Sequence, residues 1–344
     1  MKKKNVLNLI KYYAEKNDIG FRTEAMEIAK YFSNVGDYQL AEYISALLSD
    51  ANVFVPQAIE QRSNFLTKVE QSGEPLPLPE KIKNDILGVV NAIGHNVGIN
   101  KFLFHGAPGT GKTETVKHLA RILGRDLFAV DFNTLIDSRL GQTAKNIALL
   151  FDDINGLRHP EKIIILFDEI DALALDRTNS NDLREMGRAT SAVFKGMDSL
   201  NPNIVLIATT NLFRNFDKAM LRRFDSIIDF NRYTRDDLLE ISEILLSMFL
   251  AKFKFAGRNM RLFRKIISLM EEIPFPGELK NMLKTAIAFS NPANQFDYLK
   301  RLYEFDGKRN TQNLKQLQAD GFTVREIEIL TGVSKSQVAR ELKE

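Results

Sequence analysis

Apolar residues in the middle of the chain form short continuous runs that alternate with longer amphipathic stretches. Between residues 101 and 230 the continuous runs are KFLFH, LFAVDF, KIIILFDE, NIVLIATT and DSIIDF. Strands that are buried on both faces of a parallel sheet read as continuous apolar runs, and the helices that connect them read as amphipathic stretches. The pattern therefore predicts an α/β fold with a doubly wound parallel sheet of five strands.

Helical spacing of apolar residues dominates both flanks of this region. Three such runs lie before residue 50, and the chain then loses this periodicity and reaches the helix-blocking sequence GEPLPLPE. After the last strand, Thr234 and Asp237 have the spacing of a capping box that opens a long helix. The predicted organisation is a helical N-terminal domain (1–55), a linker (56–80), an α/β subdomain (81–232), an all-helical lid (233–306) and a short helical tail (307–344).

The composition of the 344 residues is that of ordinary globular domains, with 44% hydrophobic and 26% charged residues. The chain has no cysteine, which excludes disulfide scaffolds, thiolate metal sites and cysteine nucleophiles and favours a cytoplasmic location. A net charge of +3 is too small for phosphate-driven binding by the whole molecule, so any nucleic-acid site must be local. No apolar run approaches the length of a membrane span, and we expect no membrane segment.

The first predicted strand runs directly into the sequence GAPGTGKT, which is followed by a segment with good helical spacing. This is the context of a P-loop: backbone N–H groups point at phosphate oxygens, Lys112 reaches the β and γ phosphates, and the Thr113 hydroxyl ligates Mg²⁺. The alternative is a glycine-rich turn that carries lysine and threonine by chance, and the flanking strand and helix favour the phosphate site. The predicted nucleotide-binding residues are Gly106, Pro108, Gly109, Thr110, Gly111, Lys112, Thr113 and Glu114.

Two further predicted strands end in polar residues that suit phosphate chemistry. The run KIIILFDE delivers Asp168 and Glu169 to a strand end, where ligands of open α/β sheets bind. Asp168 is a candidate for holding Mg²⁺, and Glu169 for accepting the proton of the attacking water. The alternative, acidic residues that cap the next element, accounts for one of the two carboxylates. Asn211 ends the run NIVLIATTN, and its amide is placed to orient the same water.

The chain resembles the AAA family of ring-forming ATPases over about residues 80–290. The resemblance rests on GAPGTGKT, on FDEIDAL at 167–173, on IATTN at 207–211 and on FDKAMLRRFD at 216–225, in the family's order and at its spacing. It implies an ATPase that uses ATP and Mg²⁺ and assembles into a homo-oligomeric, hexameric ring.

The resemblance also implies roles for individual side chains. Asn211 matches the family's sensor asparagine, and Arg222 and Arg223 match the arginine-finger segment that reaches the nucleotide of the neighbouring subunit. A pair of surface arginines is otherwise usually a solvated face. Lys280, in PGELK, falls at the position of the second sensor, and the alternative for this residue is a solvated lysine on a helix.

A further match is the segment LIDSRLGQTAKN, which resembles the family's central-pore loop. It carries Arg139 where an aromatic residue of the family grips a threaded polypeptide. Arg139 weakens the case for threading and favours contact with an acidic partner or a phosphate backbone.

The tail at 307–344 contains three short helical runs separated by Gly321 and by Thr331-Gly332. It resembles the helix-turn-helix of recombinases and sigma-type factors, with Ser334 as the cap of a recognition helix that would expose Lys335, Gln337 and Arg340. From Lys308 onward the tail has seven basic and five acidic residues, so DNA and protein both remain possible partners.

Three functions follow from these observations and stay open on the sequence alone. The first is a Mg²⁺-dependent ring ATPase that remodels or regulates a partner protein through its N-terminal domain. The layout resembles ATPases encoded beside a subtilisin-like serine protease in bacterial defence operons, which makes such a protease a candidate partner. The second is a DNA-binding ATPase that acts as a loader or regulator through residues 307–344. The third is a nucleotide-gated binding module that turns over slowly.

Overall fold

The computed structural model describes residues 3–15, 17–48, 65–71, 75–95, 97–135, 141–173, 180–305 and 307–343. The chain divides into two compact units, residues 1–64 and 65–344. Among the described residues, no helix is both long enough and apolar enough to cross a membrane.

The described residues of the first unit form three helices, as their apolar spacing predicts. They are α1 (Lys3–Ala14), α2 (Asp18–Asn34) and α3 (Tyr38–Leu48). The middle helix begins after Asn17, whose side chain accepts a hydrogen bond from the backbone N–H of Gly20 at 2.9 Å. Ala25, Ile28 and Ala29 lie on the buried face of α2, so this helix supplies much of the small core of the unit.

A six-stranded sheet organises the second unit, and its order is β1-β3-β4-β5-β2-β6. The strands are β1 (Leu66–Lys68), β2 (Lys101–His105), β3 (Asp126–Val130), β4 (Ile163–Phe167), β5 (Val205–Thr210) and β6 (Ser226–Asp229). All neighbouring pairs are parallel except β1 and β3, which are antiparallel. The predicted α/β class with a largely parallel sheet is confirmed, and the predicted number of five strands is wrong by one.

The additional strand, β1, lies inside the segment predicted as a linker. It has only three residues, two of them polar, so it lacks the apolar run that marks the other strands. It is a strand because it pairs with β3, with Leu66 opposite Val130 at the edge of the sheet. The segment 56–80 is therefore not a simple linker, since it contributes an edge strand.

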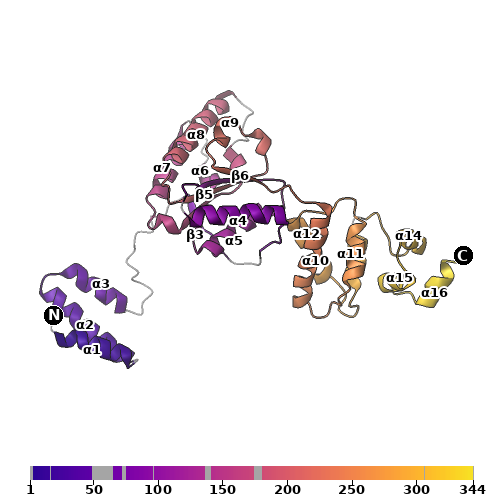
Figure 1. The fold of residues 1–344 in the computed structure, drawn as a ribbon, viewed down its shortest axis with the longest axis horizontal. Helices are drawn as coiled ribbons and strands as arrows, with labels where there is room; N and C mark the ends of the chain where they lie inside the picture. The colour runs from indigo at the N-terminus through magenta and orange to yellow at the C-terminus, as the bar shows by residue number, and fades with distance from the viewer. Residues whose placement is uncertain are drawn as a thin grey trace. The chain divides into compact units, whose positions relative to one another are not determined.

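Helices cover both faces of the sheet (Figure 1). On one face, α4 (Glu80–Gly94) and α5 (Lys112–Leu123) pack through apolar side chains such as Ile82 and Leu119 against Phe102 and Phe104 of β2. On the other face lie α6 (Phe132–Leu135), α7 (Gln142–Asn155), α8 (Ser180–Asp198) and α9 (Lys218–Leu221). Three 3₁₀ turns, Pro160–Lys162, Ile170–Leu173 and Phe213–Asn215, complete the connections. This double covering explains why the strands are apolar throughout.

Residues beyond β6 are helical, and they share one apolar core. The helices are α10 (Arg235–Lys252), α11 (Met260–Ser268), α12 (Pro276–Ala288) and α13 (Asp297–Tyr303). The predicted capping box is present: the Thr234 hydroxyl and the Asp237 backbone N–H are hydrogen-bonded, and the Asp237 carboxylate accepts from the Thr234 backbone. The shortest of these helices, α13, has seven residues. Burial of Tyr298 in this helix raises the pKa of its hydroxyl to about 12.

The tail forms α14 (Leu314–Ala319), α15 (Val324–Thr331) and α16 (Lys335–Glu341). Its apolar residues Leu317, Ile327 and Val338 belong to the same buried cluster as α10 to α13. Ser334 stands at the N-cap position of α16, yet its hydroxyl accepts no hydrogen bond from the helix backbone. The carboxylate of Glu328 accepts from the Lys335 N–H at 3.0 Å instead, so the predicted capping role of Ser334 is wrong.

Candidate functional site

The loop that joins β2 to α5 takes backbone conformations that favour glycine. Gly111 has a φ of +94° and is the residue from which α5 begins. Gly106 has a φ of +154°, and a Cβ atom placed on it would lie 3.0 Å from the Cβ of Phe230. A larger residue at position 106 would therefore push the loop away from β6.

Lys112 is the first residue of α5, and its side chain turns back into the loop. Its Nζ donates hydrogen bonds to the carbonyl oxygens of Gly106 (2.8 Å) and Ala107 (2.9 Å) and to Oδ1 of Asn211 (2.8 Å). The residue is only 7% exposed. With Oγ1 of Thr110 at 3.5 Å as a fourth acceptor, the buried ammonium group is surrounded by oxygen atoms.

Burial lowers the pKa of Lys112, and three nearby carboxylates oppose this shift. These carboxylates belong to Asp168, Asp171 and Glu169. Desolvation disfavours the ammonium form, whereas the negative charges favour it. The site therefore combines a partly desolvated cation with an excess of carboxylates, which is an environment in which the charge of a phosphate group and a metal ion can be balanced.

Asp168 and Glu169 follow β4 directly, and the first of them is tied to two other elements. One carboxylate oxygen, Oδ1 of Asp168, accepts hydrogen bonds from the hydroxyls of Thr113 (2.7 Å) and Thr209 (2.6 Å). Thr113 belongs to α5, and Thr209 belongs to β5. The structure thus brings the predicted metal-binding pair, Thr113 and Asp168, into direct contact.

Asn211 connects the lysine to the second carboxylate. Its Oδ1 accepts from Lys112, and its Nδ2 donates to Oε1 of Glu169 at 3.3 Å. The Glu169 side chain is exposed, whereas Lys112 is buried. The predicted proton acceptor and the predicted water-orienting amide are therefore neighbours, and the acceptor faces solvent.

The donor set fits a Mg²⁺ ion that is shared with a nucleotide. The oxygens of Thr113 and Asp168 are hard ligands, which Mg²⁺ prefers. Within the part of the chain that the structure describes, no three His, Cys, Asp or Glu side chains form a metal-holding group. A Mg²⁺ ion held by Thr113 and Asp168 would take the rest of its coordination shell from phosphate oxygens and water.

The helical layer touches the loop at two points that the sequence did not indicate. The Tyr233 hydroxyl donates to the carbonyl oxygen of Thr110 at 2.8 Å, and burial raises the pKa of this tyrosine. The N–H of Gly277, in the first turn of α12, donates to the carbonyl oxygen of Gly109 at 2.8 Å. Lys280 lies one turn further along α12 and is half-buried. The helix that carries Lys280 thus begins directly on the loop.

Two other neighbours support the loop from the sheet and from the preceding segment. Oδ1 of Asn231, just after β6, accepts from the backbone N–H of Ala107 at 2.7 Å. Leu76 and Leu78 lie beside Gly111, so close that a Cβ on this glycine would come within 3.5 Å and 3.8 Å of them. The proline-rich sequence that suggested a linker therefore packs against the loop.

The two predicted finger arginines have different environments. Arg223 is bound within its own chain: its Nη1 donates to the carbonyl oxygen of Ala219 at 2.7 Å, and its Nη2 lies 3.3 Å from Oδ2 of Asp198. Its guanidinium carbon also lies 4.0 Å from the ring centre of Phe194. Arg222 is exposed, and its guanidinium has no hydrogen bond or ion pair to any residue that the structure describes.

Some predicted site residues are not brought into the cluster. The Glu114 carboxylate accepts from Nζ of Lys117 at 2.7 Å along the surface of α5, and Pro108 is exposed. Within the described ranges, neither finger arginine forms an ion pair with the carboxylates that follow β4. The pore-loop residue Arg139 lies outside the described residues.

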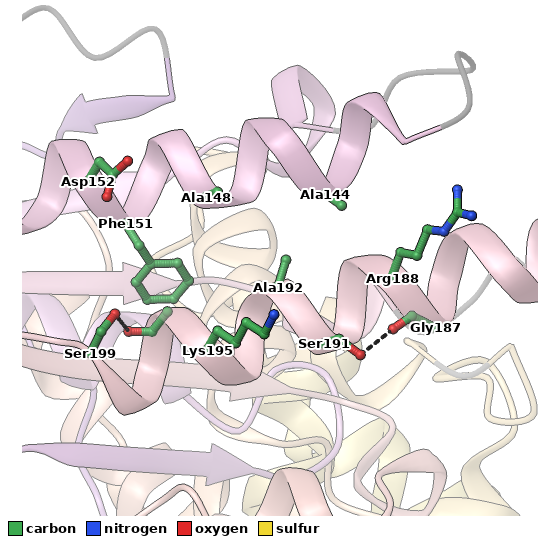
Figure 2. Close-up of a pocket in the computed structure, with 11 residues that line it drawn as sticks. Ala144, Ala148, Phe151, Asp152, Gly187, Arg188, Ser191, Ala192, Lys195 and Ser199 are labelled. Atoms are coloured by element: carbon green, nitrogen blue, oxygen red, sulfur yellow. Dashed lines mark hydrogen bonds between the residues drawn. The ribbon is translucent and has the colours of Figure 1, made fainter.

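A groove of about 830 Å³ lies between α7 and α8, on the face of the sheet opposite α4 and α5 (Figure 2). Small side chains line it, including Ala144, Ala148 and Ala192, together with the charged residues Arg188 and Lys195. None of the predicted site residues borders this groove. The groove is thus separate from the residues that suit phosphate chemistry.

The α/β region of the chain matches a known protein family. Residues 102–232 match the model of the ATPase family associated with various cellular activities (AAA). The chain is 40% identical over 133 residues to an uncharacterized AAA family ATPase, y4kL, of Sinorhizobium fredii. It is 35% identical over 130 residues to a putative 26S proteasome regulatory subunit homolog of Methanothermobacter thermautotrophicus. These matches cover 39% and 37% of this chain and only 39% and 34% of the relatives.

A solved structure shares the fold over a longer stretch. It is the HORMA:CdnC:Trip13 complex of E. coli MS115-1, of which one chain aligns with a TM-score of 0.53 and 20% sequence identity. The alignment covers 70% of this chain and 95% of that one. At this level of identity, the likeness concerns the fold.

Proposed function

Residues 102–232 form an AAA-family ATPase domain, and on this premise we propose that the protein hydrolyses ATP with Mg²⁺ in a homo-oligomeric ring and remodels or regulates a partner protein. The observation that carries the proposal is the chain of contacts from Lys112 through Asn211 to Glu169. It joins a phosphate-binding cation, a water-orienting amide and a proton acceptor at adjacent strand ends. Such a set suits attack by water on a terminal phosphoryl group.

Each residue of the site has one task in this proposal. Lys112 and the backbone N–H groups of residues 109–113 hold the phosphates, and Glu169 accepts the proton of the attacking water. Thr113 and Asp168 hold Mg²⁺, which when bound neutralises charge on the β and γ phosphates.

The helical layer at residues 233–306 is proposed to act as a lid. Tyr233 and Gly277 contact the loop that binds the phosphates. A movement of this layer would therefore shift the loop and change its contacts with the nucleotide. Lys280 is proposed to reach the γ phosphate from this lid.

The ring assembly is proposed because, among the described residues, no arginine side chain hydrogen-bonds to Lys112, Asp168 or Glu169. Arg222 is exposed and free to act on a neighbour, whereas Arg223 is held by Asp198 and Phe194. We therefore assign the finger to Arg222, and the role of Arg223 becomes that of holding the finger segment against α8. This refines the sequence-based expectation that both arginines reach the neighbouring nucleotide.

The partner is proposed to be a protein. The Methanothermobacter relative is named for a regulatory subunit of the proteasome, and the solved structure is a complex with other proteins. Both agree with regulation of a partner, and a subtilisin-like protease remains the candidate that the layout of the chain suggests. The N-terminal unit, residues 1–64, is proposed to carry the contact.

The experiment combines turnover with a trapped complex. Purified full-length protein should hydrolyse ATP only with Mg²⁺, and Glu169→Gln should bind ATP without hydrolysing it. The trapped variant, loaded with ATP, should retain the partner, whereas Lys112→Ala should not. Absence of ATP turnover in the wild-type protein, with and without the captured protein, would contradict the proposal.

A DNA-binding role is the second candidate, and the exposed surface of α16 favours it. Lys335, Gln337 and Arg340 are exposed on this helix, whose first turn has no acidic residue. Deletion of the tail is a poor test, because its apolar residues belong to the lid core. The surface variant Lys335→Ala/Arg340→Ala is cleaner: salt-dependent DNA binding that disappears in this variant, with ATP turnover stimulated by DNA, would favour the second candidate.

A further inference from the structure

Thr209 lies on β5, two residues before the predicted sensor asparagine, and it is only 1% exposed. Its hydroxyl donates to Oδ1 of Asp168 at 2.6 Å and accepts from the backbone N–H of Glu169 at 2.9 Å. One buried hydroxyl is therefore hydrogen-bonded to both residues of the carboxylate pair. The proposed hydrolysis assigns it no task.

The second of these bonds acts on a backbone in an unusual conformation. Glu169 has a φ of +51°, and only one other described residue besides glycine, His159, has a positive φ. A left-handed backbone is uncommon for a residue with a side chain and is retained where surrounding contacts hold it. The Thr209 oxygen is the acceptor of the Glu169 N–H, so it stabilises this conformation directly.

The first bond fixes the neighbouring carboxylate from the side of the sheet. The same oxygen of Asp168 also accepts from Thr113, so it is held from α5 by one hydroxyl and from β5 by another. Thr113 lies in the first turn of α5, directly after the predicted phosphate-binding loop, whereas Thr209 belongs to a central strand. The contact from β5 is thus the one that anchors Asp168 to the rigid core of the sheet.

From these contacts we propose that Thr209 is a positioning residue, which sets the backbone of Glu169 and the carboxylate of Asp168 relative to each other. In this role it acts through these two residues, to which its hydroxyl is hydrogen-bonded. Loss of its hydroxyl would leave Asp168 bound to Thr113 alone and would release the N–H of Glu169. The proton acceptor would then sample positions away from the attacking water, and an error of about 1 Å lowers a rate by about a hundredfold.

The inference rests on the proposed ATP hydrolysis, and its test therefore includes a measurement that needs no nucleotide. Thr209→Val removes the hydroxyl and nearly conserves the volume, and Thr209→Ser keeps the hydroxyl. Thr210→Val is the matched control, because Thr210 is equally buried on the same strand and its hydroxyl accepts from the N–H of Leu212, at 3.0 Å, rather than from the carboxylate pair. Thr209→Ala, compared with Thr209→Ser, replaces the valine variant if that variant does not fold.

The nucleotide-free measurement is amide hydrogen exchange of the peptide that spans Glu169. Exchange should become faster in Thr209→Val, and it should stay as in the wild type in Thr209→Ser and Thr210→Val. The kinetic measurement is the split between kcat and KM for ATP. We expect kcat to fall by roughly ten- to a hundredfold in Thr209→Val with KM within about twofold, and to return to within about threefold of wild type in Thr209→Ser.

Three kinetic results would overturn the proposal. They are a wild-type kcat in Thr209→Val, a rise in KM with kcat unchanged, and a loss of kcat that the serine variant does not rescue. Unchanged amide exchange in Thr209→Val would remove the structural basis of the proposal even if turnover fell. A wild-type protein without any ATP turnover would contradict the proposed function instead, and the exchange measurement would still decide whether Thr209 holds the Glu169 backbone.

Discussion

The edge of the sheet where Lys112, Asn211 and Glu169 meet and the tail at 307–344 differ in the contacts that organise them. At the sheet edge, polar side chains bond to one another: Lys112, Asn211 and Glu169 form a continuous chain of contacts. In the tail, apolar side chains such as Leu317 and Val338 are fully buried in the core that α10 to α13 share, and the polar residues of α16 face solvent. The first region is built around polar contacts and the second around apolar anchoring.

This difference teaches where substitutions should act on chemistry and where they should act on stability. A buried polar network loses its function when one member is changed, because its partners are left unsatisfied or misplaced. An apolar anchor loses stability in proportion to the contacts removed, and the chemistry elsewhere continues. Substitutions at the sheet edge, at the helices around it and in the tail test whether the effects separate in this way.

The largest effects are expected at Lys112 and Glu169. Lys112→Ala should abolish nucleotide binding, because the cation that faces the phosphates is lost, whereas Glu169→Gln should keep ATP bound and stop hydrolysis, because only the proton acceptor is lost. Binding of a fluorescent ATP analogue and release of phosphate measure the two effects. Equal ATP affinity in Lys112→Ala and wild type would contradict the P-loop assignment.

The next largest effect is expected at Arg222. Arg222→Ala should bind ATP normally but lose about 10³-fold or more in turnover, since a finger arginine stabilises charge on the transferred phosphoryl group. Mixing it with Lys112→Ala protein should restore part of the activity, because the two defects lie on different subunits of one interface. Native mass spectrometry establishes that mixed rings form, and mixed rings without turnover above the sum of their parts would contradict the assignment.

Arg223→Ala serves as the comparison for Arg222, and it should act differently. Its guanidinium holds α8 through Asp198 and Phe194, so its loss should lower thermal stability together with activity. Thermal unfolding of the two variants measures the difference. An Arg222→Ala variant that is as destabilised as Arg223→Ala would remove the distinction between the two arginines.

A smaller effect is expected where α12 meets the loop at 106–113. A Cβ on Gly277 would lie 3.0 Å from the Cα and the carbonyl oxygen of Gly109, so Gly277→Ala should displace the start of α12. We expect ATP affinity to fall by roughly fivefold, the equivalent of about 1 kcal/mol of overpacking. Gly88→Ala in α4 is the matched control, because a Cβ at that position would meet no atom within 4 Å, and it should be neutral or slightly stabilising. Equal ATP affinity in both variants would argue against a lid that touches the loop.

The smallest effect is expected in the tail. Lys265 of α11 donates to the Glu326 carboxylate at 2.9 Å, and its ammonium lies 4.8 Å from the ring centre of Phe322. Glu326→Gln should lower the free energy of unfolding by about 1–2 kcal/mol at neutral pH and leave ATP turnover within about twofold of wild type. A tenfold loss of turnover in this variant would show that the tail takes part in the chemistry.

The pH dependence of this loss follows from the pKa of Glu326. Burial favours the neutral acid, but the hydrogen bonds from Lys265 and Thr323 outweigh it and hold the pKa of Glu326 below its ordinary value. A carboxylate with a lowered folded-state pKa stabilises the fold above its unfolded pKa, and this stabilisation is lost as the pH falls through the folded pKa. The difference in unfolding free energy between wild type and Glu326→Gln should therefore be full at neutral pH and shrink on acidification.

The sequence by itself determined the features that depend on neighbours along the chain. Five strands were predicted because each is a continuous apolar run, and the loop at 106–113 because its glycines, Lys112 and Thr113 are contiguous. The capping box that opens α10 also needs only a spacing of three residues. The polar residues after β4 and β5 were found because parallel strands end at the same edge of a sheet, so a polar residue at each strand end already implies proximity.

Only the tertiary structure decided the contacts between residues that are distant in the sequence. Tyr233 reaches the Thr110 carbonyl across 123 positions, and no local pattern predicts this hydrogen bond. The strand β1 is too short to carry a signal, and its partner β3 gives it order. Arg222 and Arg223 are chemically identical neighbours, and only the packing of α8 against Arg223 makes their environments different. Such through-space neighbours are set by the sheet order and the helix packing, which the spacing of residues along the chain does not specify.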